Sequence, residues 1–110
     1  MQEIPTERTV QFALRAAQLA KQQASESALR AKQIAKKHRS AARVAQVAEM
    51  TAQLAENAYQ IAKFLSEEAK NKPVFAERAY FAAQAVSDAA LAVLPAATFC
   101  CDCALKAEEQ

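Results

Sequence analysis

Three cysteines near the end of the chain are the residues best suited to chemistry. Cys100 and Cys103 form a C-x-x-C pair around Cys101 and Asp102. On a helix these two thiols share one face, so they could hold a soft metal or form a redox couple. A structural zinc site needs four ligands, and the sequence has neither a second cysteine pair nor a second histidine. Because free cysteine is often buried, a core position is the simpler interpretation, and thiol-based metal binding or redox work is the alternative.

A basic cluster is the second candidate. Its members include Lys36, Lys37, Arg39 and Arg43. Residues 1–43 carry nine Lys or Arg against three Glu, whereas residues 44–110 carry five against nine Asp or Glu. Nucleic-acid surfaces usually combine a larger net charge with neighbouring aromatic residues, and cations at a helix end are stabilising in themselves. We therefore expect charge complementarity between neighbouring helices, with nucleic-acid binding as a second alternative.

Enzyme chemistry lacks its usual parts. The sequence has no glycine, so neither a glycine-rich phosphate loop nor a G-x-S-x-G nucleophile turn can form. Carboxylate–histidine metal bundles need a glutamate three positions before a histidine, and His38 has none. We expect no catalytic residue and no cofactor.

Composition indicates one all-α domain over residues 1–110. The sequence contains 29 alanines and no glycine, which favours helix and disfavours the tight turns of hairpins. The first ten residues are polar, and no uninterrupted run reaches the ~18 apolar residues of a membrane span. Three clustered cysteines do not make a disulfide framework. These features predict a cytoplasmic protein without a membrane segment.

The clearest helix is predicted over residues 41–70. Apolar residues recur there at alternating spacings of three and four, the period of a helix that packs on other helices. They are Val44, Val47, Thr51, Leu54, Ala58, Ile61 and Leu65, with Ala48, Ala55 and Ala62 beside them. Ser40 is a candidate N-cap, and Pro73 prevents simple continuation. We expect this whole stripe to form the core seam of the helix.

Three further helices are predicted, over about residues 6–37, 73–94 and 96–108. The first carries an alanine stripe, formed by Ala13, Ala17, Ala20, Ala24, Ala28, Ala31 and Ala35. An unbroken rod through residue 40 would place the first two apolar stripes roughly 130–140° apart, so we predict a break near Lys36–Ser40. The third helix is apolar around most of its circumference, which predicts a central position, and Pro95 is expected to end or kink it. Together these elements predict an antiparallel up-down bundle of about four helices with an alanine-rich core.

The function that remains by elimination is non-catalytic binding to another protein, as adaptors, regulators and toxin-neutralising proteins do. Leu14 and Leu29 fall on the polar side of the first helix, so they are candidates for the binding surface together with the basic cluster. Alanine-rich helices can also pair between chains, which makes a homodimer a further option.

Overall fold

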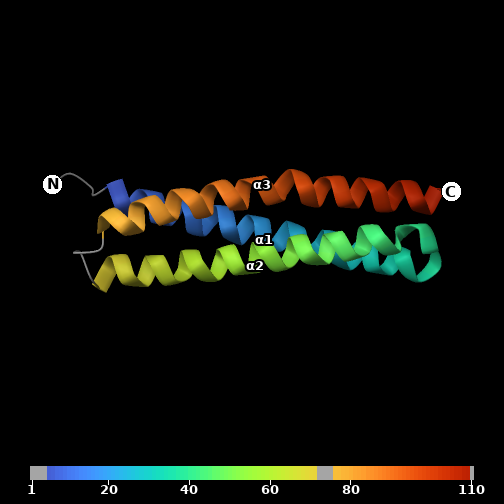
Figure 1. Cartoon of the computed structure of the whole chain (residues 1–110), viewed down its shortest axis with the longest axis horizontal. Helices are drawn as coiled ribbons and strands as arrows, with labels where there is room; N and C mark the ends of the chain where they lie inside the picture. Colours follow the sequence, from blue (N-terminus) through green and yellow to red (C-terminus); the bar gives the residue numbers. More distant parts are fainter. Residues whose placement is uncertain (1–4, 72–75, 110) are drawn as a thin grey trace.

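Three long helices lie side by side and form the fold (Figure 1). The computed structural model describes residues 5–71 and 76–109, with side chains from 8 to 68 and from 78 to 109. Helix α1 spans Pro5–Lys37, the short 3-10 helix η1 spans Arg39–Ala41, α2 spans Ala42–Asn71 and α3 spans Ala76–Glu109. Figure 1 shows α2 returning along α1, and α3 running in the same direction as α1. The predicted all-helical class is confirmed.

The helical backbone is interrupted at His38, between α1 and α2. The backbone of His38 is extended, with φ −129° and ψ 106°, and η1 follows it directly. His38 N–H still donates to the carbonyl of Ile34 at 2.8 Å, and Ala41 N–H donates to the carbonyl of His38 at 3.0 Å. The predicted break near Lys36–Ser40 is therefore confirmed. Ser40 does not sit at the start of α2 as expected, because it lies within η1.

Pro95 lies inside α3, so the prediction of four helices is wrong. The segments predicted over 73–94 and 96–108 belong to one helix, and their predicted start at Pro73 lies outside the described residues. Proline disfavours a helix interior because it lacks an N–H and crowds the carbonyl four residues earlier. Here Pro95 and Leu91 are both exposed, so the proline ring takes no position in the core. Buried residues on both sides of the proline, among them Val93 and Ala97, keep the helix packed on the bundle.

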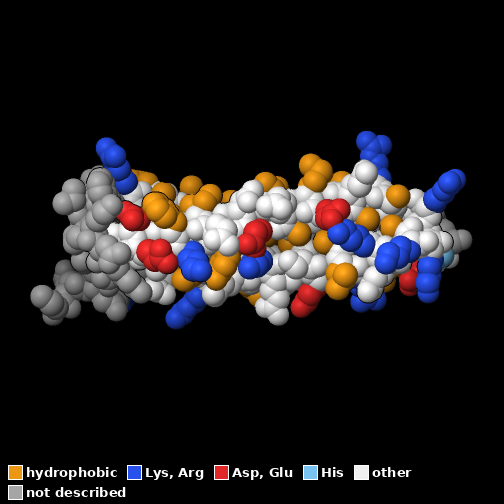
Figure 2. Space-filling model, turned by 90° about the horizontal axis from the view of Figure 1, so that it is seen from below, with side chains coloured by type: hydrophobic (Ala, Val, Ile, Leu, Met, Phe, Trp, Pro, Cys, Tyr) orange, Lys and Arg blue, Asp and Glu red, His pale blue; other side chains and the backbone are white. Residues whose placement is uncertain are grey.

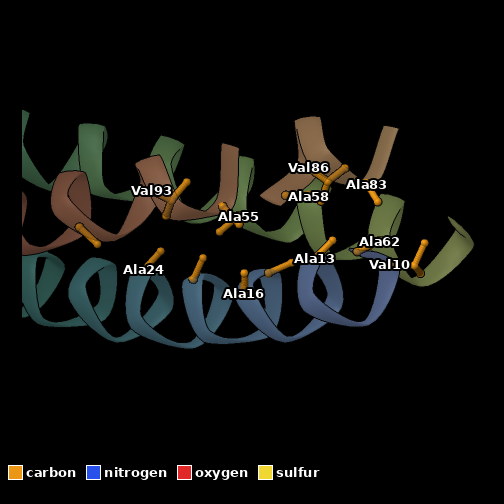
Figure 3. Close-up of a cluster of buried hydrophobic side chains, with 14 of the residues drawn as sticks. Val10, Ala13, Ala16, Ala24, Ala55, Ala58, Ala62, Ala83, Val86 and Val93 are labelled. Carbon is orange, nitrogen blue, oxygen red and sulfur yellow. The ribbon is translucent and has the colours of Figure 1, made fainter. Parts of the chain in front are cut away.

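Alanine fills most of the core. The alanine stripe of α1 is buried except for Ala35, which is half-buried. It meets alanines of α2 and α3 that are also inaccessible, and Figure 3 shows how these short side chains point into the space between the helices. Side chains this small allow helix axes to approach toward ~8 Å. Buried Ser27 adds one polar link, since its hydroxyl donates to the carbonyl of Ala97 at 2.8 Å.

Ion pairs connect the basic first helix to α2. Lys21 Nζ lies 3.0 Å from Glu56 Oε2, and Lys32 pairs with Glu49 one to two turns from the η1 end of the bundle. A hydrogen bond from Gln60 and then the contact with Lys21 hold the pKa of Glu56 below its usual range. The expected charge complementarity between neighbouring helices is present at these two pairs. Both are solvent-exposed, so their contribution to stability is small.

Candidate interaction surface

Several large apolar side chains of α2 lie on its outer side. Ala55 is fully buried, whereas Leu54, one position earlier, is 62% exposed. Likewise, Ala48 and Ala62 are buried, whereas Val47 and Ile61, the larger residues directly before them, are exposed. The expectation that the whole stripe lies in the core is therefore wrong for Val47, Leu54 and Ile61, whereas Val44 and Leu65 are half-buried against the core. Because the helices approach closely, a methyl group fits between them and a leucine does not, so the smaller residue of each adjacent pair faces the bundle axis.

The exposed residues of α2 form a line with heptad spacing, which we call the α2 ridge. Its members are Val47, Met50, Leu54, Asn57, Ile61 and Phe64, separated by three, four, three, four and three positions. Every member is exposed. Asn57 is the single polar member, and its Oδ1 accepts a hydrogen bond from Gln53 Nε2 at 3.1 Å. Heptad spacing is the pattern by which a helix packs along the length of another helix, and none of the described residues covers this line.

A second line with the same spacing runs along α3 and consists of small residues. We call it the α3 valley, and its members are Ala82, Ala85, Ala89, Ala92 and Ala96. Ala82 is half-buried and the other four are exposed. Phe99 and Cys103 continue the line toward the end of α3. Neither line contains a charged residue within these limits.

The α2 ridge and the α3 valley lie on the side of the bundle away from α1. At about 100° per residue, the ridge lies roughly 130° from the centre of the buried stripe of α2. Glu49 and Glu56, which pair with lysines of α1, lie on the other side of that stripe. The valley lies roughly 120° from the buried stripe of α3, on the side opposite Thr98 and Asp102. Those two residues line a hollow shared with α1.

These angles place both lines on one flat surface. In a triangular arrangement of three helices, the outward direction of a two-helix surface lies about 120° from the direction to the bundle axis. The ridge and the valley together therefore form the outer surface of α2 and α3, which we call the apolar face. Figure 2, seen from the α2 side, shows hydrophobic side chains following one another along the upper edge, above a middle band rich in charged side chains.

The apolar face is comparable in size to the largest apolar patch of a typical monomer. The ridge extends ~26 Å along α2 at 1.5 Å per residue, and the described bundle is 59 × 18 × 15 Å. Two helices side by side therefore present a face of about 450 Å², within the range of patches that are often functional.

The predicted binding residues do not meet on this face. Leu14 is half-buried against the core, and Leu29 is 59% exposed beside a shallow hollow that it shares with Lys36 and Lys37. Arg39 lies in η1, and Arg43 precedes the ridge by one heptad step. The basic cluster thus surrounds the connection between α1 and α2. The ridge was not among the predicted sites, although its signal was present in the sequence as a larger apolar residue directly before buried Ala48, Ala55 and Ala62.

The cysteine pair is divided between core and surface. Cys100 is buried among alanines near the η1 end of the bundle, and Cys101 and Cys103 are half-buried. Burial, and then the neighbouring Cys103, raise the pKa of the Cys100 thiol. A thiol with a raised pKa stays protonated at neutral pH and is a poor nucleophile. Among the described residues, no group of three or more His, Cys, Asp or Glu stands together in a way that could hold a metal ion.

We expect Cys100 to react with iodoacetamide at least about tenfold more slowly than Cys101 at mildly alkaline pH, because it is both buried and protonated. Peptide mass spectrometry over a time course measures both alkylation rates. The two rates should become equal when the chain is unfolded in urea. The folded state holds the Cys100 proton more tightly than the unfolded chain. The free energy of unfolding should therefore be insensitive to this thiol at neutral pH and fall as the pH rises past the ordinary thiol range. Equal rates in the folded chain would contradict the burial of Cys100.

Comparison of the chain with protein-family models, with curated proteins and with solved structures finds no match. The segment Arg78–Glu109 of α3 is long and apolar enough to cross a membrane by length and composition, and 28% of its most apolar window is buried. Core helices of water-soluble proteins meet the same criterion, so this is a weak indication.

Proposed function

We propose that this chain is a non-catalytic protein–protein interaction module whose binding surface is the apolar face. The observation that carries the proposal is the α2 ridge, which leaves five large apolar side chains in water at heptad spacing. Burying one such side chain is worth about 1.5–3 kcal/mol relative to leaving it exposed. The antiparallel three-helix bundle then acts as a rigid support that presents this surface. Three unpaired cysteines fit a cytoplasmic location for such a module.

The alternative functions have no comparable support. Thiol chemistry would use Cys100, which is buried and whose pKa is raised. Nucleic-acid binding would use the basic cluster, but the neighbouring Lys32 already pairs with Glu49. Exposed Phe12 lies near the opposite end of α1 from this cluster, and exposed Phe64, Phe81 and Phe99 lie on α2 and α3.

Site-specific photo-crosslinking in the cells that produce the chain tests the proposal. A photoreactive phenylalanine analogue at Phe64 should give discrete covalent adducts with protein, because this position lies on the apolar face. The same analogue at the exposed Gln22 of α1 should give few adducts and serves as the matched control. Adducts of equal yield at both positions, or none at Phe64, would count against a binding surface on α2 and α3.

A further inference from the structure

The apolar face combines large and small side chains in a way that is complementary to itself. The α2 ridge stands beside the α3 valley on one flat surface. A second copy turned by a half-turn about an axis parallel to the helices would place α2 of each copy over α3 of the other. Each ridge would then lie over a valley. We propose that the partner on the apolar face is a second copy of this chain in this arrangement, an inference that rests on the proposed function.

The heights of the residues along the bundle support this arrangement. Figure 3 shows Ala58 at about the same height along the bundle as Val86, and Ala62 at about the same height as Ala83, and all four belong to one buried cluster. A half-turn about an axis parallel to the helices leaves every height unchanged. Moving along both helices in steps of three and four residues then matches each ridge residue of one copy with the α3 residue of the second copy that lies at the same height. The resulting pairs, ridge residue first, are Phe64 with Ala82, Ile61 with Ala85, Asn57 with Ala89, Leu54 with Ala92, Met50 with Ala96 and Val47 with Phe99.

The sizes within these pairs are complementary. Five ridge residues meet an alanine, so each side chain enters a space that a methyl group leaves free. The sixth pair reverses the sizes, because the one large residue on the line of α3, Phe99, meets Val47, the smallest apolar residue of the ridge. An isologous interface requires a surface that is complementary to itself in this way.

The charges at one end of the face are also complementary. One further heptad step along the two lines reaches Glu68 on α2 and Arg78 on α3. Both lie close to the connection between these helices, and the half-turn brings Glu68 of each copy toward Arg78 of the other. Glu68 already takes part in an interaction within its own chain, so this pair would add orientation rather than much affinity.

The width of the face favours a second copy over a single partner helix. A helix is about 10 Å wide with its side chains, so one helix would cover only part of a surface formed by two. A second copy presents an equally wide surface. About 450 Å² from each copy, or about 900 Å² in total, is less than the roughly 1,200–2,000 Å² of a standard specific interface, so we expect a weak, micromolar dimer.

Sedimentation equilibrium over the micromolar concentration range tests the inference. The unmodified chain should change from monomer to dimer over this range. Leu54→Asp should weaken the dimer at least about 100-fold, because the substitution occurs twice in a symmetric interface. Leu29→Asp is the matched control, since Leu29 is 59% exposed against 62% for Leu54 but lies off the apolar face. Its dimer affinity should stay within about threefold of the unmodified chain. Equal dimerisation of the two variants would overturn the inference.

Ala92→Leu is a second test variant, and unlike Leu54→Asp it introduces no charge into the interface. Filling the valley beneath Leu54 should weaken the dimer at least about tenfold, and a tighter dimer would overturn the ridge-over-valley arrangement. Alkylation of Cys103 gives an independent measurement. The rate should fall with rising protein concentration in the unmodified chain and stay constant in Leu54→Asp.

Other results would separate this inference from the proposed function. The chain could stay monomeric at all concentrations while the analogue at position 64 crosslinks to a different protein. That result would overturn the proposed homodimer but support the proposed interaction module. A monomer that co-sediments with vesicles of phosphatidylcholine and phosphatidylglycerol, and gives no protein crosslinks, would overturn both.

Discussion

Replacing Ala55 with leucine should lower the free energy of unfolding by about 3 kcal/mol or more. Ala55 is fully buried where α2 faces the other two helices, and its neighbours in the core are mainly alanines. Three extra carbon atoms cannot be accommodated by a rotamer change of such short neighbours. The helices must therefore move apart, and contacts are lost along the bundle. Urea unfolding followed by circular dichroism, at one fixed protein concentration, measures the effect.

Ala42→Leu is the control for this experiment. Ala42 begins α2 and is exposed, so the same change should alter the free energy of unfolding by no more than about 0.5 kcal/mol. If Ala55→Leu were as stable as Ala42→Leu, the core would have room for a leucine. The close approach of the helices, and with it the explanation for the exposed α2 ridge, would then be wrong.

Replacing Pro95 with alanine should raise the free energy of unfolding by about 2–3 kcal/mol. Alanine restores the backbone N–H that can donate to the carbonyl of Leu91, and it removes the crowding of that carbonyl by the proline ring. No side-chain packing is lost, because Pro95 is exposed. The midpoint of thermal unfolding should rise by roughly 10 °C in a domain of this size. Calorimetry at matched concentrations measures it.

Thr98→Ala provides a comparison on the same helix. The Thr98 hydroxyl donates to the carbonyl of Leu94 at 3.1 Å and is exposed, so its loss should have a small effect. A Pro95→Ala variant no more stable than Thr98→Ala would show that the second half of α3 does not need the backbone bond that the proline removes.

The sequence predicted those parts of the fold that depend on local pattern. The alanine stripe of α1 is regular, and few other arrangements can bury it. The end of α1 followed from helical phase, because one continuous rod would have pointed its two stripes in different directions. The expected end or kink at Pro95 follows from a local rule, whereas packing on both sides of the proline keeps α3 continuous. Buried Ala97 and Cys100 hold the helix together beyond the proline.

The interaction surface was harder to predict because α2 carries two apolar lines one residue apart. Leu54 and Ala55 belong to lines with the same period, so periodicity alone cannot say which one is buried. Larger side chains are buried more often in most proteins, so the sequence predicts both lines in the core, whereas the structure exposes Val47, Leu54 and Ile61. The close approach of alanine-lined helices explains this difference. This packing effect appears only when all three helices are considered together, and it is what places the α2 ridge in solvent.

A core made largely of methyl groups also affects how stability varies with temperature. Each buried alanine removes little apolar surface from water, so unfolding exposes less of it per residue than in a domain built on leucine and phenylalanine. The heat-capacity increment of unfolding scales with that surface and should be correspondingly small. A small increment flattens the stability curve, so the free energy of unfolding should change little on cooling, and cold denaturation should lie far below the freezing point of water.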